Sequence, residues 1–448
     1  MTDLSDAQRR LLEQRLAARP AAPTRAETSI PARAPGPVPL SPGQSALLYE
    51  YRMRPDEAVY NIVHAYRISG PLDTGRLRSA LRAAVARHEP LTTSFGPGRT
   101  PLGPEVATDI VEVEADAERF EQLAWGEARR RFDLDAGPLV RVTVVRLGED
   151  DHGLVLALHH VSSDASSLAN LWRDLDHAYR GQELPEPVRS YSDHADWQAS
   201  RIGAADREFW SDHLGPDPHT VVLPLAGPGP DEPDGYLTRP LPIESSRLRE
   251  AGHRPMPFFL ATFAALLQRY TDTDDVIVGV VASTRDHPVV EPLVGYFLTV
   301  LPLRLEVDPR STPAQMARAT DEVLAEALIH RHVPYAEIAA GLRRRGVAQP
   351  DPARVMFVLD EPHRPQLSGC TVDGHLVHPG ASVTDLTVFV RPCEAAYELS
   401  LEWSGQVYRR NDVEALAEEY ARMLEWGVDH PGTPWNALGV DADAVGAP

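Results

Sequence analysis

Two adjacent histidines and a nearby aspartate are the residues of this sequence best suited to chemistry. His159 and His160 end the apolar run 154–158, and Asp164 follows four residues after His160. A short apolar run of this kind predicts a buried strand, and Ser163 or Asp164 can cap the amphipathic helix that follows. A strand that ends in histidines and turns into a helix places polar side chains at the edge of a sheet.

The two histidines are expected to have different tasks. Successive residues at a strand end point to opposite sides, so one ring can face a cavity as a base while its neighbour packs inside the protein. Asp164 can neutralise a cation or cap the helix. A core histidine beside a helix cap explains the same residues without chemistry. Adjacent histidines suit one metal ion poorly, so we expect no metal site.

Composition narrows the possible functions. A chain of 448 residues can bury a large core and should divide into two lobes. Its net charge of −21 argues against nucleic acid as a partner. All 44 basic residues are arginines, which excludes a Schiff-base lysine and a Walker A lysine. Cys370 and Cys393 form no paired motif. Without a signal peptide or a long apolar run, we expect a cytoplasmic protein with no membrane contact.

Several motifs together resemble the condensation domains of nonribosomal peptide synthetases. The segment from His159 to Ala165 is similar to their HHxxxDG signature, of which chloramphenicol acetyltransferase shares the shorter HxxxD part. Further partial matches occur in the order that the family shows. They lie at Ser41 and Gln44, at 87–95, at 191–197, at 292–300 and at 330–335.

The resemblance implies an α/β (α+β) fold of two chloramphenicol-acetyltransferase-like lobes, arranged as a V-shaped pseudo-dimer with a central tunnel. We expect an N-terminal helix and a Pro/Ala linker over 1–36, because apolar residues recur at helical spacing over 4–16. The N-terminal lobe with the histidine motif would cover 37–215 and the C-terminal lobe 216–448. This division rests on the Pro- and Gly-rich stretch 215–235.

The resemblance also implies a reaction. A carrier-protein-bound acyl or aminoacyl thioester would condense with an amine, or with a hydroxyl group, to form an amide or ester in natural-product biosynthesis. Both substrates can arrive on phosphopantetheine arms of carrier proteins, so no bound cofactor is expected. His160 would act as the base or would position the nucleophile.

The remaining site residues have structural roles in this scheme. Asp164 is expected to pair with an interior arginine, for which Arg285 is the candidate, because it follows a buried strand over 276–282. His159 is the better candidate for packing. Ala165 stands where the family usually has Gly, so its methyl group either narrows the tunnel or forbids a positive φ.

Ser163 and Tyr296 are further candidates for the wall of the tunnel. Ser163 is available as a hydrogen-bond donor, but the sequence contains no GxSxG elbow that would make a serine the nucleophile. Tyr296 belongs to the segment that resembles the family's fifth motif.

Three other functions remain open on the sequence. The chain can be a coenzyme-A-dependent acyltransferase, an epimerising relative that shares the histidine motif, or an inactive domain that recruits partner proteins. We expect either a free-standing enzyme or an excised domain. The arginine cluster 343–345 can contact a carrier protein or its phosphopantetheine, or can be a solvated helix face.

Overall fold

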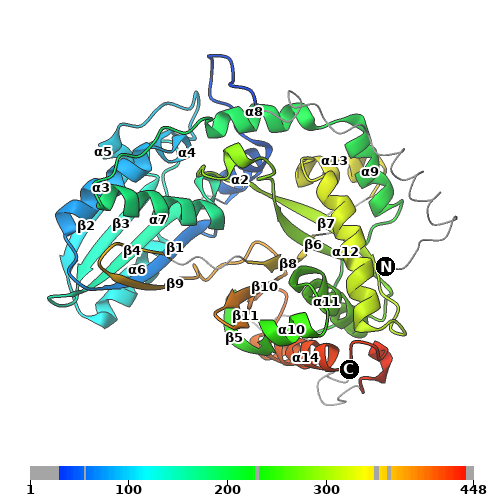
Figure 1. Ribbon diagram of the computed structural model, residues 1–448. Helices are drawn as coiled ribbons and strands as arrows, with labels where there is room; N and C mark the ends of the chain where they lie inside the picture. Colours follow the sequence, from blue (N-terminus) through cyan, green and yellow to red (C-terminus); the bar gives the residue numbers. More distant parts are fainter. Residues whose placement is uncertain are drawn as a thin grey trace, which may run out of the picture.

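The computed structural model describes residues 30–54, 57–225, 227, 232–347, 353–360 and 365–439. The helix expected over 4–16 lies outside these residues. Figure 1 shows two lobes, each with its own sheet, that spread from a junction near α2 (Pro42–Met53) and α8 (Tyr191–Arg201). The V-shaped arrangement of two α/β lobes agrees with the expected fold.

The first lobe contains a five-stranded sheet in the order β2-β3-β4-β1-β9. Its strands are β1 (Asn61–Ser69), β2 (Thr108–Glu114), β3 (Val140–Arg146), β4 (Asp151–His159) and β9 (Thr371–Leu376). Helices α3 (Thr74–Ala86) and α7 (Ala165–Tyr179) pack on one face, and α6 (Ala117–Arg129) packs on the other. Because both faces of β4 are covered, its residues from 152 to 159 are all buried.

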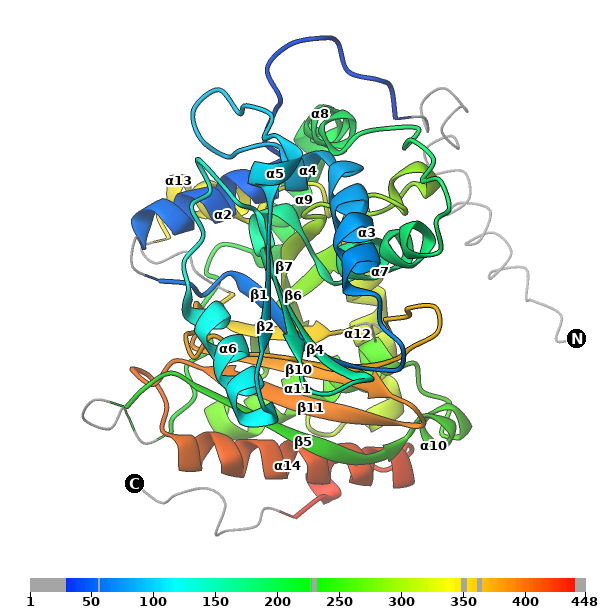
Figure 2. The same cartoon turned by 90° about the vertical axis from the view of Figure 1, so that its left-hand side faces the viewer.

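The second lobe contains a six-stranded sheet in the order β5-β11-β10-β8-β6-β7. Its strands are β5 (Gly235–Glu244), β6 (Asp275–Ser283), β7 (Leu298–Glu306), β8 (Val355–Leu359), β10 (Leu386–Cys393) and β11 (Ala396–Trp403). Its larger helices are α11 (Pro255–Thr271), α12 (Pro313–Ile329) and α14 (Arg410–Asp429). Helix α11 is buried along nearly its whole length, since it lies between the sheet and the other two helices (Figures 1 and 2).

Short helices complete the described part of the chain. They are α4 (Glu89–Thr92), α5 (Pro104–Ala107), α9 (Ala204–Leu214), α10 (Ser245–Glu250), α13 (Tyr335–Arg344), η1 (His160–Ser162), η2 (Pro288–Val290) and η3 (Trp435–Ala437).

Two elements connect the lobes across the division that we expect near residue 215. Helix α9 precedes that point, yet Trp210 and Leu214 belong to the core of the second lobe. Strand β9 follows it, yet pairs antiparallel with β1 in the first sheet. The division at residue 215 therefore stays a prediction. In the structure, α9 from before residue 215 packs in the second lobe, and β9 from after it belongs to the sheet of the first lobe.

A small apolar cluster lies where the lobes meet. Tyr191 and Trp197 of α8 pack there against Val290, Leu293 and Phe297. The backbone of Gly295 approaches the ring of Tyr191 so closely that an added Cβ would lie 2.1 Å from it. This cluster fixes the segment that carries Tyr296 beside the histidine motif.

Candidate active site

The histidine motif lies at a strand-to-helix junction, as the sequence predicts. Strand β4 ends at His159, the 3₁₀ turn η1 begins at His160, and α7 begins at Ala165. Asp164 is the residue that caps the helix, because its Oδ1 accepts the N–H of Ser167 at 2.7 Å. The turn changes the direction of the chain between the two histidines and separates their side chains.

His159 lies inside the first lobe. Its exposed fraction is 3%, and its ring contacts the rings of Tyr51, Tyr60 and Phe132. The Nδ1 atom accepts the N–H of Val161 at 3.1 Å. Burial lowers the pKa of His159 to about 3, so the ring is neutral at pH 7. This environment fits packing, which is the role that the sequence favours for it.

His160 faces the opposite way and is only half-buried. Its Nδ1–H donates to the carbonyl of Ser163 at 2.8 Å, which leaves the lone pair on Nε2. The backbone N–H of His160 donates to the carbonyl of Tyr60 at 2.8 Å. Burial lowers the pKa of His160 below its ordinary value of 6.5. A neutral imidazole with a free Nε2 can accept a proton at pH 7.

Asp164 and Arg285 form the predicted ion pair. The Nη2 atom of Arg285 lies 3.1 Å from Oδ1 of Asp164, and the side chains are 8% and 2% exposed. The other carboxylate oxygen, Oδ2, accepts the N–H of Phe297 at 3.0 Å. Because Arg285 and Phe297 belong to the second lobe, the buried charge of Asp164 joins the two lobes directly beside His160.

Arg285 is held by several acceptors besides Asp164. Its Nη1 donates to the carbonyls of Val290 and Leu293 at 2.8 and 2.9 Å. Its Nη2 also donates to the hydroxyl of Ser167 at 2.8 Å, and its guanidinium stacks 3.8 Å from the centre of the Phe297 ring. The guanidinium therefore connects the carbonyls of Val290 and Leu293 in the second lobe with Asp164 and Ser167 in the first.

Tyr296 contacts the candidate base directly. Its ring meets the ring of His160 edge to face, with centroids 5.1 Å apart. Ala165 is exposed and helical, and its φ is not among the positive values of the described residues, so its methyl group restricts space rather than the backbone. Ser163 contributes its carbonyl to His160, while its hydroxyl makes one long contact of 3.4 Å with the carbonyl of Asp164.

Residues of the other partial motif matches also form hydrogen bonds that support the segment with the two histidines. The sequence alone did not reveal this role. Gln44 donates from Nε2 to the carbonyl of Val161 at 3.0 Å. The hydroxyl of Tyr191 lies 2.5 Å from the carbonyl of Tyr296 and 2.8 Å from Oγ of Ser41. The signal was present as partial motif matches at Ser41, Gln44 and Tyr191, but their partners are distant in sequence.

The segment 87–95, another of the partial motif matches, contributes contacts that stabilise the first lobe. Arg87 and His88 both contact the carboxylate of Asp174 on α7, at 2.6 and 2.9 Å. Glu89 accepts the hydroxyl of Ser192 on α8 at 2.8 Å. These contacts hold α7, which begins directly after the histidine turn, and α8, whose Tyr191 bonds to the carbonyl of Tyr296.

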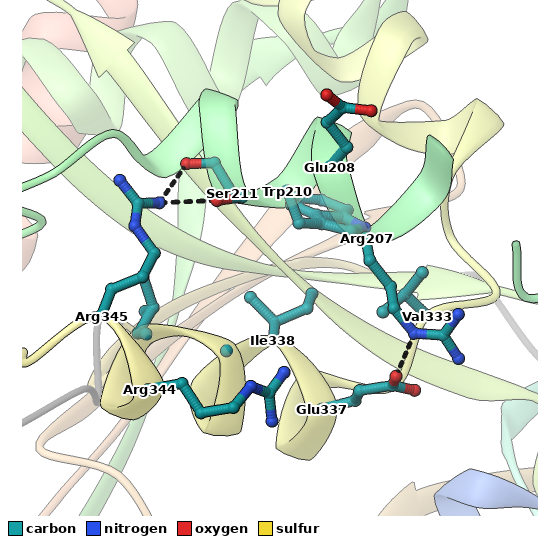
Figure 3. A pocket seen from close by; sticks show the side chains of 11 residues that line it. Arg207, Glu208, Trp210, Ser211, Val333, Glu337, Ile338, Arg344 and Arg345 are labelled. Carbon is teal, nitrogen blue, oxygen red and sulfur yellow. Dashed lines mark hydrogen bonds and ion pairs between the residues drawn. The ribbon is translucent and has the colours of Figure 1, made fainter. Parts of the chain in front are cut away.

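A separate hollow of about 270 Å³ lies between α9 and α13 (Figure 3). Trp210, Ile338 and Leu342 contribute apolar surface, while Arg344 and Arg345 lie at its rim. The hollow does not include the histidine motif. Across the described ranges, no group of three or more His, Cys, Asp or Glu side chains is arranged to hold a metal ion. None of the helices in those ranges has the length and apolar character that crossing a membrane requires.

Comparison with known proteins identifies the family. The family model described as "Condensation domain" matches residues 35–444. The chain is a member of the condensation-domain family. Condensation domains of nonribosomal peptide synthetases are acyltransferases that form amide bonds between carrier-bound substrates in natural-product and antibiotic biosynthesis.

Curated relatives are large synthetases that this condensation domain matches in part. It is 29% identical to phosphinothricin tripeptide synthetase PhsC of Streptomyces viridochromogenes over 98% of its own length and 43% of the relative. It is 31% identical to the probable non-canonical nonribosomal peptide synthetase CymA of Salinispora arenicola, over 93% of its own length and 6% of the relative. The chain thus spans less than half of these proteins.

Solved structures confirm the chloramphenicol-acetyltransferase-like fold of this condensation domain. The X-domain from teicoplanin biosynthesis superposes with a TM-score of 0.77 at 22% identity, covering 92% of this chain and all of the other. The first condensation domain of the calcium-dependent antibiotic synthetase superposes with a TM-score of 0.74, also at 22% identity, covering 88% and 97%.

Proposed function

We propose that this condensation domain transfers an acyl or aminoacyl group from a carrier-bound thioester to an amine, with a hydroxyl group as the other acceptor type. The observation that carries the proposal is the orientation of His160. Its Nδ1–H is bound to the carbonyl of Ser163 at 2.8 Å, so Nε2 has its lone pair available. The lowered pKa keeps that nitrogen unprotonated at pH 7.

The reaction needs one proton transfer at this nitrogen. The acceptor nitrogen attacks the thioester carbonyl carbon, the new C–N bond forms, and the C–S bond breaks. Nε2 of His160 takes the proton of the attacking amine and returns it to the departing thiolate of the phosphopantetheine arm. A positioned base typically contributes about 10²–10⁴-fold. Holding two tethered substrates together adds a further entropic advantage.

The other candidate residues act by holding His160 in place. Asp164 and Arg285 fix the turn against the second lobe, and Tyr296 supports the imidazole from the side. His159 anchors the end of β4 inside the aromatic core. In this proposal, only His160 touches the reacting atoms.

Carrier proteins are the proposed partners, and the charge of the chain restricts where they can bind. With a net charge of −21, the molecule repels acidic partners except at a local cluster of arginines. Arg343 and Arg344 end α13, Arg345 follows directly, and all three are exposed. Arg344 and Arg345 lie at the rim of the hollow in Figure 3. This cluster supplies the positive surface that a carrier contact requires.

The test is product analysis by mass spectrometry. Wild type and His160→Ala receive acyl groups on a panel of carrier proteins, and separately on coenzyme A, with free or carrier-bound amines and alcohols. Ser166→Ala is the matched control, because Ser166 lies on the same segment outside the proposed chemistry. We expect a new amide or ester mass with carrier-bound donors in wild type and control, and its loss in His160→Ala.

The panel also separates the other functions. Turnover with acyl-coenzyme A but not with carriers would identify a coenzyme-A-dependent acyltransferase, and loss of α-deuterium without condensation would identify an epimerising enzyme. Equal slow amide formation in all three proteins would mean uncatalysed aminolysis and a binding role. A binding role would have a parallel in this fold, because the X-domain from teicoplanin biosynthesis is described in a complex with OxyB.

A further inference from the structure

One face of the second sheet carries polar side chains toward the first lobe. In β11, Leu399, Leu401 and Trp403 belong to the apolar core of the second lobe. Side chains alternate along a strand, so Glu398 and Glu402 lie on the opposite face. That face is turned toward the first lobe, away from α11 and α14 (Figure 1).

Glu402 is held there by a histidine from the segment that returns from the first lobe. His378 follows β9, and its Nε2 lies 2.8 Å from Oε2 of Glu402. Its Nδ1 accepts the N–H of Gly380 at 3.0 Å, which requires a neutral ring with the proton on Nε2. Tyr236, the cross-strand neighbour of Glu402, stacks on the imidazole with centroids 4.5 Å apart. The carboxylate is therefore fixed in position by a neutral group.

The charge of Glu402 is not offset by an arginine of the same face. Arg391 bonds to Asp360 at 2.9 Å and to Glu398 at 3.3 Å, and no ion pair with Glu402 other than that of His378 is found among the described residues. His378 uses Oε2 of Glu402, and Oε1 has no hydrogen-bond donor within the described part of the chain. Since the side chain is 15% exposed, it is open to a ligand.

The partner of Glu402, His378, adjoins the packing around the histidine motif. It follows Val377, whose N–H donates to the carbonyl of Val63 on β1 at 2.8 Å and which belongs to the apolar cluster on which Tyr60 and Tyr296 pack. The carbonyl of Tyr60 accepts the backbone N–H of His160 at 2.8 Å. Through His378, the carboxylate of Glu402 on the second lobe is therefore held beside the segment that packs with Tyr60 and Tyr296, the latter of which contacts His160.

We propose that Glu402, positioned by His378, selects substrates that carry a cationic group in addition to the reacting amine. The ligand chemistry is an ammonium or guanidinium that donates a hydrogen bond to the carboxylate. The group belongs either to the donor acyl chain or to the acceptor. This inference rests on the proposed function for its meaning, but the binding step needs no reaction.

The test compares lysyl and norleucyl substrates, which differ in the terminal ammonium. Each is made as a pantetheine thioester with a formyl-blocked α-amine for the donor arm, and as an amine with a free α-amino group for the acceptor arm. Binding is measured by calorimetry. For these measurements, each donor and each acceptor is replaced by a thioether analogue that cannot react. Wild type, Glu402→Gln and His378→Phe are compared with Glu398→Gln, which removes a charge from the same strand and face.

We expect wild type to prefer lysyl over norleucyl by about ten- to a hundredfold in one arm, the range typical of a hydrogen bond to a charged group. Glu402→Gln should abolish this preference, His378→Phe should weaken it, and Glu398→Gln should keep it. Equal binding of both analogues by wild type, or an unchanged ratio in Glu402→Gln, would overturn the inference. A lysyl preference in calorimetry without any amide product would support Glu402 and refute the proposed reaction instead.

Discussion

Replacing Arg285 by Ala removes a guanidinium from the junction between the lobes, and the structure allows the cost to be worked out. Removing one member of a buried ion pair typically costs about 3–5 kcal/mol, because the other charge stays buried without a partner. Asp164 would keep three donors, the N–H and the hydroxyl of Ser167 and the N–H of Phe297. The retained donors place the expected loss at the lower end, about 3 kcal/mol.

The assay is urea denaturation, followed by the near-ultraviolet circular dichroism of the chain, to which the aromatic residues at the junction contribute. Arg78→Ala is the matched control, because Arg78 pairs with Glu112 at the surface, where both side chains are 40% exposed. A surface pair contributes about 0–1 kcal/mol, so the control should stay near wild type. Arg285→Lys should lie between wild type and Arg285→Ala, because lysine keeps the charge but lacks the planar fork.

A double-mutant cycle with Asp164→Asn isolates the pair from the other contacts of Arg285. We expect a coupling energy of at least about 1 kcal/mol, since residues in one hydrogen-bonded network are not additive. Loss of less than about 0.5 kcal/mol in Arg285→Ala, or strict additivity in the cycle, would refute the reasoning that this pair holds the lobes together.

Three further predictions concern the surroundings of the site. The folded chain holds the pKa of His159 at about 3 against an ordinary 6.5, so the unfolded chain binds more protons between these values. The contribution of His159 to the free energy of unfolding should be constant above pH 6.5 and fall below it. In urea titrations at several pH values, His159→Phe should therefore lose less stability than wild type between pH 6.5 and lower pH, and an identical pH dependence would contradict this. Gly295→Ala should destabilise by at least about 1–3 kcal/mol in thermal unfolding, because its Cβ would lie 2.1 Å from the Tyr191 ring; an unchanged melting temperature would contradict this contact. Tyr191→Phe should cost about 1–2 kcal/mol and lower kcat more than it raises KM, because the segment of Tyr296 loses a hydrogen bond; equal kcat would show that this bond does not position the site.

Much of the fold near the site follows from local pattern. The apolar run before His159 predicts β4, Asp164 caps α7, and the β-branched run 276–282 predicts β6 and the position of Arg285 behind it. These features depend on residues close together in the chain, where strand and cap signals are strong.

The elements that the sequence did not predict depend on distant partners. Strand β9 has mostly exposed or half-buried residues and no alternation, so only its pairing with β1, some 300 residues earlier, makes it a strand. The contacts of Gln44 with Val161 and of His378 with Glu402 likewise join separate segments. Residue type alone does not encode which carbonyl or carboxylate a side chain will meet.

The most direct test of the central role of His160 is the single-turnover rate of amide formation as a function of pH, measured for wild type and His160→Ala with one preloaded donor carrier. If Nε2 takes the proton, the wild-type rate should be flat near pH 7 and fall with one protonation below 6.5, since the pKa of His160 is lowered. His160→Ala should be slower by about 10²–10⁴-fold, should lack this protonation, and should regain rate with added imidazole. A variant within about threefold of wild type, with the same pH profile, would show that another group accepts the proton.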